Sequence, residues 1–315
     1  MPIIDYESES FPPGGPVTNG PAQQINVSWN DIVWAALTVG RPNRNAVFQY
    51  GNSSFYEAIF RLSLVRMALE QLGPGARRLR RTSAARALDP TEKGAVNYFI
   101  GMLMCKLFAD KLLDAPWMLH LDVFRPALNV VLSSRSRPDL IGQRISGEWV
   151  ALESKGRISA PDTNAKTRAK QQAQRVVSVS GTVPQFHIGA ITYLKGEALQ
   201  FYWRDPEPPR HDRASLDYLE FNPDMWRYHY ELVLAYIQAG PRGLRFVGQP
   251  ETEENEDVTV KIHPEVFDRL QLSQWAEAKE WCVNHHDTLT ADDFRSDGTR
   301  VIAGESWLMP FEEGI

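Results

Sequence analysis

The sequence predicts an α/β protein in which helices flank a mixed β-sheet. Residues 91–204 show the order helix, several strands, helix and two strands, which is the order of a sheet covered by helices. The expected strands are rich in β-branched and large apolar residues, and the expected helices begin at capping residues. With 315 residues, 43% hydrophobic and 23% charged, the chain is long enough for one large domain or two modest ones.

Two regions are expected before this core. Residues 1–28 are rich in proline and glycine and poor in large apolar groups, so we expect a flexible arm. Residues 29–90 predict a helical N-terminal region, with a short helix over 28–38 and a second that Ser53 or Ser54 caps and that ends near Leu72. A basic run closes this region and consists of Arg77, Arg78, Arg80, Arg81 and Arg86.

Residues 91–250 form the expected core and the helix that follows it. Asp89 and Glu92 have the spacing of a helix cap, and that helix extends to about Leu113. Asn164 is expected to cap a polar helix that ends near Val177. Strands are expected over 117–123, 127–132, 137–143, 149–156, 186–194 and 198–203, and a further helix between Asn222-Pro223 and Gly240-Pro241. Residues 251–315 predict an acidic linker, a short strand and two helices.

The residues with the clearest chemical meaning are Pro138-Asp139 and Glu153-Ser154-Lys155. Both patterns are common as letters, and Glu-x-Lys occurs again at Glu277-Ala278-Lys279. The second copy lies in a helical pattern, where residues two apart point in different directions. Glu153 and Lys155 lie in a strand pattern, where residues two apart share a face.

The loop between the two strands sets the expected register. If residues 144–148 form a five-residue loop, Asp139 lies opposite Glu153 on the neighbouring strand. Directly opposed residues lie roughly 4.5–5.5 Å apart, which is close enough for two carboxylates to share one cation. Hard oxygen ligands suit Mg²⁺ or Mn²⁺. Lys155 on the same face would orient the attacking water and offset charge that develops on a phosphate.

This pattern resembles the PD-(D/E)XK superfamily, which includes many restriction endonucleases and DNA-repair nucleases. The resemblance covers residues 91–204 and implies a restriction-endonuclease-like core with helical N-terminal and C-terminal additions. It implies that Asp139 and Glu153 bind the metal, with the Ser154 carbonyl as a further ligand, and that Lys155 is the catalytic lysine.

Accessory positions are also implied by the resemblance. Many members have an acidic residue on the helix before the sheet, for which Glu92 is the candidate; the alternative is that Glu92 only completes a helix cap. Some members have a glutamine on the helix after the lysine strand, and Gln171 and Gln172 fall there. The tyrosine four residues later is absent, since Arg175 and Val176 stand at those positions.

The charge distribution favours a polyanionic partner. The formal net charge is −5, so any basic surface must be local. The expected nucleic-acid contacts are Arg135, Arg137, Arg157, Lys166, Arg168 and Lys170. Such residues would contact phosphates without reading sequence. The alternative for the three on the helix is an ordinary solvated face.

The sequence does not support a cysteine or histidine metal site, a secreted protein or a membrane protein. Cys105 and Cys282 are far apart and fit buried apolar positions in a reducing compartment. The adjacent His285 and His286 lack further ligands at useful spacing and fit a helix C-terminus. There is no signal-like or membrane-spanning run, which predicts a cytoplasmic protein without a membrane partner.

The expected function is therefore Mg²⁺-dependent (or Mn²⁺-dependent) cleavage of DNA, in restriction or antiviral defence by analogy with the superfamily. The alternatives are a non-catalytic nucleic-acid-binding or assembly protein that retains the fold, and an interaction module in which the motif is accidental. Double-strand cleavage would need two active sites, which favours a homo-oligomer or an assembly with other proteins.

Overall fold

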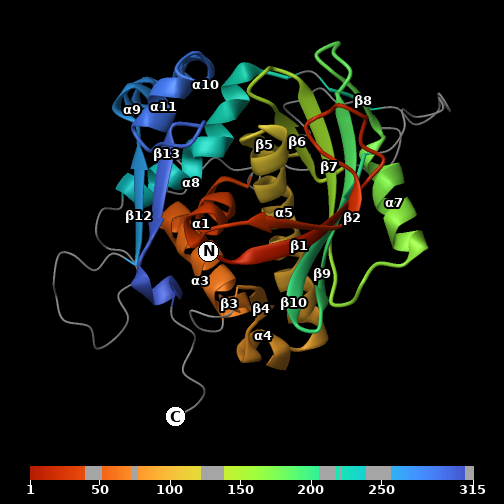
Figure 1. The fold of residues 1–315 in the computed structure, drawn as a ribbon. Coiled ribbons are helices and arrows are strands. Elements are labelled where there is room, and N and C mark those ends of the chain that lie inside the picture. Colours follow the sequence, from red (N-terminus) through yellow and green to blue (C-terminus); the bar gives the residue numbers. More distant parts are fainter. Residues whose placement is uncertain are drawn as a thin grey trace.

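The computed structural model describes residues 1–39, 52–71, 77–121, 138–205, 217–219, 221–238 and 257–308. Within these residues the protein is mixed α/β, as predicted. A nine-stranded mixed sheet has the order β2-β1-β10-β9-β7-β6-β5, with β3 and β4 attached at β10 (Figure 1). Its strands are β1 (Ile3–Glu9), β2 (Gly20–Asn26), β3 (Leu69–Gln71), β4 (Leu79–Arg81), β5 (Trp117–His120), β6 (Leu140–Gln143), β7 (Trp149–Gly156), β9 (Phe186–Lys195) and β10 (Ala198–Arg204).

Helices cover both faces of this sheet. They are α1 (Trp29–Thr38), α3 (Asn52–Ala68), α4 (Ser83–Ala87), α5 (Pro90–Leu113), α7 (Thr163–Ala173) and α8 (Arg227–Gln238), with the short helix η1 (Pro223–Trp226) before α8. A small parallel pair joins β8 (Val176–Val179) to β11 (Asp217–Leu219). The expected strand over 127–132, the Gly240-Pro241 helix end and the acidic residues 251–256 lie outside the described residues.

The central hairpin has the predicted register. β6 and β7 are antiparallel, with Leu140 opposite Leu152 and Gln143 opposite Trp149, which leaves the expected five-residue loop 144–148. β7 then crosses through α7 to the parallel neighbour β9. The predicted hairpin of β9 and β10 is also present, and its turn places Gly196 and Glu197 at positive φ.

Helix α5 packs on one face of the sheet at very short range. Asp89 caps it and Glu92 bonds back to the Asp89 amide at 3.3 Å, which confirms the predicted capping box. At Gly156, a Cβ atom would lie 1.8 Å from the carbonyl oxygen of Asn97. At Gly101, a Cβ would lie 2.9 Å from Ser154 Oγ. The absence of two side chains therefore lets α5 rest on the C-terminal end of β7.

Helix α7 covers the opposite face. Its backbone lies over Gly189, where a Cβ would be 2.6 Å from the Lys170 amide nitrogen. The prediction that Asn164 caps this helix is wrong: Asp162 is the cap, and its side chain accepts a bond from the Ala165 amide at 2.7 Å. The helix also ends earlier than predicted, because the apolar residues from Val176 continue as strand β8.

The predicted flexible arm is wrong. Residues 1–28 form the antiparallel strands β1 and β2, and β1 extends the sheet by pairing in parallel with β10. Ile4 is fully buried, and the Tyr6 ring packs edge-on against Phe108 at 5.2 Å between centroids. The proline- and glycine-rich run 12–16 lies only in the connection between the two strands. Strand pairing with an existing sheet thus stabilises a segment that is too polar to fold by itself.

The prediction of a wholly helical region over 29–90 is also wrong, because this region contains two short strands. Ser28 caps α1 as expected, with a complete capping box to Asp31. Helix α3, however, ends at Ala68 and not near Leu72, because the next three residues pair as β3 with β4. Part of the arginine-rich run therefore forms strand β4, which pairs with β3 and with β10.

The C-terminal region packs against the same body. It contains β12 (Val258–Ile262), α9 (Pro264–Gln271), α10 (Trp275–Asn284), α11 (His286–Ala291), β13 (Thr299–Ala303) and the short helix η2 (Glu305–Leu308). The two strands are antiparallel. Three helices separate them where two were predicted, because His285 ends α10 and a further short helix begins at His286.

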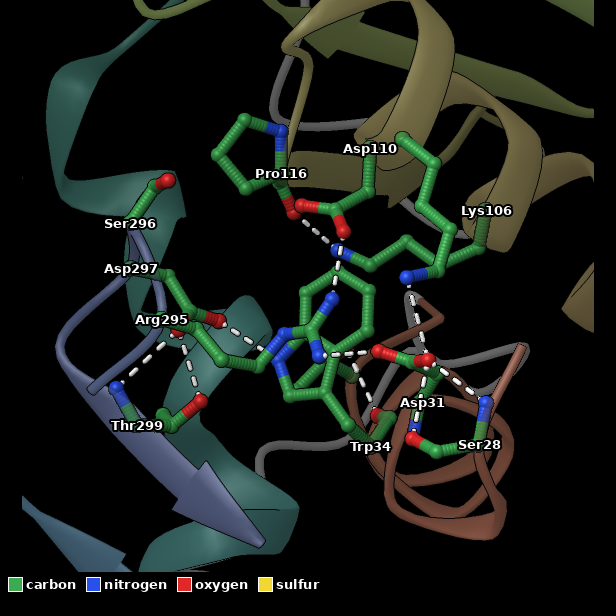
Figure 2. A network of polar contacts seen from close by, with 12 residues as sticks. Ser28, Asp31, Trp34, Lys106, Asp110, Pro116, Arg295, Ser296, Asp297 and Thr299 are labelled. Carbon is green, nitrogen blue, oxygen red and sulfur yellow. Dashed lines mark hydrogen bonds and ion pairs between the residues drawn. The ribbon is translucent and has the colours of Figure 1, made fainter. Parts of the chain in front are cut away.

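A buried polar network fixes this region to helices α1, α5 and α8 (Figure 2). Asp297 is fully buried and accepts bonds from Trp34 Nε1 at 2.9 Å and His229 Nε2 at 2.8 Å. Both the amide and the hydroxyl of Thr299 donate to its other oxygen. These donors hold the pKa of Asp297 well below its usual range despite burial. Arg295 forms ion pairs with Asp31 at 2.7 Å and with Asp110.

We expect Gly156→Ala to lower the free energy of unfolding by about 2 kcal/mol or more, because α5 must move away from β7. The added methyl group would meet the backbone of Asn97, which has no rotamer by which to yield. Gly94→Ala is the matched control, because a Cβ there meets nothing within 4 Å, and it should stabilise α5 by about 0.5–1 kcal/mol. Urea unfolding of both variants checks this; equal losses would contradict the close approach.

Candidate functional site

The two predicted carboxylates lie at the same end of the β6–β7 hairpin. Asp139 directly precedes β6, and continuing the β6–β7 register by one step sets it opposite Glu153. The Ser154 amide donates a hydrogen bond to Asp139 Oδ2 at 2.9 Å. The Leu121 amide donates to the Asp139 carbonyl at 2.8 Å. A bond from β7 and one from the residue that follows β5 therefore fix Asp139 beside Glu153 and Ser154.

Glu153 is the most deeply buried member of the site. Only 1% of it is exposed, and its Oε1 forms an ion pair with Lys155 Nζ. Its Oε2 is buried without a hydrogen-bond partner in the part of the chain that the structure describes. The Lys155 side chain is 40% exposed, so the site opens toward solvent on the lysine side. The structure thus brings Asp139, Glu153 and Lys155 together, with one carboxylate oxygen left unsatisfied.

Burial controls the protonation of both acids. Desolvation, helped by the charge of Asp139, raises the pKa of Glu153 to about 8, although Lys155 opposes the shift. Burial also raises the pKa of Asp139, against the Ser154 amide and Lys155. Two desolvated carboxylates side by side retain a proton at neutral pH unless a cation replaces it.

The donor set fits a hard divalent cation. Mg²⁺ typically takes one or two carboxylates and completes its shell with waters and substrate phosphate oxygens. Asp139 and Glu153 supply two carboxylates, and the unpartnered Oε2 of Glu153 is a ligand atom without another bond. Among the described residues no group of three or more His, Cys, Asp or Glu side chains gathers around one point. Any cation here would therefore be bound by the pair and by non-protein oxygens, with the Ser154 carbonyl as the further predicted ligand.

The predicted accessory residues do not join this group. Glu92 is exposed at the start of α5, where its side chain accepts a hydrogen bond from the Asp89 amide in the helix cap. Gln171 is exposed and Gln172 is half-buried on α7. In the described residues neither glutamine side chain forms a hydrogen bond with Asp139, Glu153 or Lys155. The position four residues beyond Gln171 lies after the end of α7, so a helical Gln-x-x-x-Tyr pair could not form there.

The expected basic face is partly neutralised. Lys166 Nζ lies 3.1 Å from Glu7 and 3.2 Å from Glu9, both on β1, and 3.9 Å from the centroid of the Tyr202 ring. Lys166 is therefore already paired with two carboxylates of β1, and its expected contact with a phosphate stays a prediction.

The other predicted contacts are placed differently. Arg157 lies 3.9 Å from Asp162 and remains about one-third exposed. Arg168 is exposed, and the charge of Lys170 acts on the buried Asp205. Arg135 and Arg137 lie outside the described residues.

Two residues near the carboxylates were missed from the sequence. The Tyr98 hydroxyl on α5 lies 2.9 Å from His120 Nε2 on β5. Burial and the charges of Asp139 and Glu153 raise the pKa of Tyr98 to about 12. Tyr98 lies within an otherwise apolar helix and His120 within an apolar strand, so neither has a local sequence signal. Asn97, the residue before Tyr98, packs on Gly156, on the face of β7 opposite to Glu153 and Lys155.

No family model, curated protein or solved structure matches this chain. The resemblance to the PD-(D/E)XK superfamily rests on the residues of the hairpin. Within the described residues no helix is both long and apolar enough to cross a membrane.

Replacing Glu153 tests its raised pKa. The ordinary pKa of 4.5 and the folded value of about 8 imply that the unfolded chain loses this proton first. Wild-type stability should therefore fall as pH rises from about 4.5 to about 8. In Glu153→Gln this loss should shrink by about 2 kcal/mol, as urea unfolding in EDTA at pH 5 and pH 8.5 would measure. The same pH dependence in both proteins would show that Glu153 titrates normally.

Proposed function

We propose that this protein is a metal-dependent nuclease that hydrolyses phosphodiester bonds of DNA. The observation that supports this most directly is the buried Glu153 carboxylate, which has one oxygen paired with Lys155 and the other without a partner, beside Asp139. Such a site is costly in the cation-free protein, because burial disfavours both charges. A site of this kind is more readily explained by ligand binding than by stability.

Each residue has a distinct role in this proposal. Asp139 and Glu153 would hold the cation, which supplies Lewis-acid polarisation of the phosphate and lowers the pKa of bound water. Lys155 is close enough to Glu153 to orient the attacking water and to stabilise charge on the phosphate oxygens. The Ser154 amide keeps Asp139 in place through its hydrogen bond, and the Ser154 carbonyl is the proposed additional ligand.

The fold is compatible with the proposed superfamily. Strands β5, β6 and β7 form an antiparallel meander, and β7 crosses over α7 to its parallel neighbour β9. Helices α5 and α7 cover opposite faces of these strands (Figure 1). A restriction-endonuclease-like core, a cytoplasmic location and a role in restriction or antiviral defence belong to this proposal by analogy. The alternative is a nucleic-acid-binding or assembly protein that has this fold without catalysis.

Asp139→Asn should abolish Mg²⁺-dependent cleavage of plasmid and linear DNA, with a loss of at least about 10³-fold, because one of two metal ligands loses its charge. Glu277→Gln is the matched control. Glu277 belongs to the other Glu-x-Lys sequence, is exposed on α10 and should leave cleavage unchanged. Gel assays with Mg²⁺, Mn²⁺ or EDTA measure this. Cleavage that survives EDTA and Asp139→Asn would contradict the proposal, and metal-independent DNA binding without cleavage would favour the alternative.

Mn²⁺ affinity should rise with pH. Below a pKa of about 8 the cation must displace a proton from Glu153, so its affinity should increase about tenfold for each pH unit between pH 6 and pH 8. Isothermal titration calorimetry in two buffers of different ionisation enthalpy would show about one proton released for each ion bound. A pH-independent affinity would argue against cation binding at Glu153.

A further inference from the structure

The two faces of β7 lie against different helices. A Cβ atom at Gly156 would meet the backbone of Asn97, so Gly156 faces α5. Because side chains alternate along a strand, Lys155 and Arg157 point to the opposite face, where α7 lies. The Arg157 amide donates to the Thr192 carbonyl at 2.8 Å, so the chain still runs beside β9 at this residue. The cationic face of β7 therefore extends past the end of the strand.

Strand β9 continues this face toward its own C-terminal end. Ile191 lies beside Lys155 in the parallel pairing of β7 with β9, and it belongs to one buried cluster with Ala169 of α7. Lys195 is four residues further along β9, so alternation places it on the same face, and it is exposed. The regular pairing of Lys195 with Ala198 shows that β9 keeps this alternation to its last residue.

Three cations thus form one row on the α7 face, which we call the basic row: Lys155, Arg157 and Lys195. A strand rises about 3.3 Å per residue and neighbouring strands lie about 4.8 Å apart. Successive members of the row are therefore separated by roughly 7–8 Å between Cα atoms. The row begins at the ion pair of Lys155 with Glu153 and leads away from the buried carboxylates toward the ends of β7 and β9.

Acidic residues compensate the outer part of the basic row only weakly. Arg157 lies 3.9 Å from Asp162, which is 67% exposed and also caps α7. Lys195 forms no ion pair with any residue that the structure describes. The nearest acid in its turn is Glu197, whose carboxylate is held by Arg81 of β4 through two bonds of 3.1 Å. Lys195 therefore presents an uncompensated charge at a turn that β4 holds in place.

We propose that the basic row is a phosphate track for the DNA strand that is cut, in which Arg157 and Lys195 each contact a phosphate beyond the scissile phosphodiester at Lys155. This rests on the proposed nuclease function, which identifies the polyanion as DNA. Contacts of this kind fix the position and direction of the strand without reading its sequence. Lys195 has no local sequence signal for this role, because only the pairing of β7 with β9 brings it into the row.

The test measures binding of a fluorescent DNA duplex to the full-length protein in EDTA, which removes the cation required for cleavage. Lys195→Gln and Arg157→Gln should each weaken binding roughly five- to tenfold near about 0.1 M salt. Each should also reduce the slope of log affinity against log salt concentration by about one, because one phosphate contact is lost. Fluorescence anisotropy over a series of salt concentrations measures both quantities.

Arg86→Gln is the matched control. Arg86 is an exposed cation on α4. Its neighbour Ala85 lines a pocket together with Ile100 of α5 and Leu199 of β10, so α4 lies on the α5 side of the sheet. The substitution removes the same charge as Arg157→Gln but from the side away from the basic row. It should therefore keep the wild-type affinity and salt slope.

The outcomes separate this track from the nuclease proposal. An unchanged salt slope in Lys195→Gln would overturn the track, even where Asp139→Asn abolishes cleavage and the nuclease proposal stands. An equal loss in Arg86→Gln would also overturn it, because binding would then follow net charge and not position, and so would a wild-type protein that binds no DNA. If binding depends on Lys195 but no cation supports cleavage, the track stands and the nuclease proposal falls. If Arg157→Gln fails to fold, Lys195→Gln alone decides the inference.

Discussion

The direct contact of α5 with the end of β7 is the constraint on which the site depends. A side chain at Gly156 would collide with the Asn97 carbonyl, and one at Gly101 would press on Ser154. Bare backbone at these points lets the helix cover one face of β7, while Glu153 and Lys155 point to the opposite face, where α7 lies over Gly189. The same approach packs Phe108 of α5 against Phe201 on β10, with 3.9 Å between ring centroids. One set of contacts therefore builds the main core and holds in place the strand that carries Glu153 and Lys155.

Two buried acids in this chain, Asp297 and Glu153, have pKa values shifted in opposite directions. Asp297 accepts four hydrogen bonds, from Trp34, His229 and both donors of Thr299, so its charged form is favoured. Glu153 has Lys155 as a partner on one oxygen and none on the other, so its neutral form is favoured. The first arrangement stabilises the attachment of the C-terminal region. The second arrangement leaves one Glu153 oxygen without a partner, so that a bound cation would stabilise the charged carboxylate.

The sequence predicted local features well where short-range chemistry decides them. The capping box of Asp89 and Glu92 and the five-residue loop before β7 both follow from neighbouring residues. The prediction of a flexible N-terminal arm failed because this segment is stabilised by the pairing of β1 with β10, about 195 residues away in the chain. Composition cannot show such a partner, since the strand gains its hydrogen bonds from a sheet that must already exist.

The same long-range pairing explains which site residues were misjudged. Asp139, Glu153 and Lys155 were found because one hairpin holds all three, whereas Tyr98 and His120 meet each other only through the packing of α5 on β5. Lys166 was assigned to DNA because it belongs to a basic run beside the strands of the site, but β1 brings Glu7 and Glu9 to it. A misplaced strand thus changed the interpretation of a helix on the same face of the sheet.

This neutralisation bears on how a phosphodiester would be bound. With Lys166 occupied by two carboxylates and Arg157 close to Asp162, part of the basic charge near α7 is already compensated. Exposed ion pairs of this kind contribute little attraction to a distant polyanion. Attraction to the phosphate would then depend largely on the cation itself and on Lys155. That dependence agrees with a site whose carboxylates are too buried to remain charged without a metal.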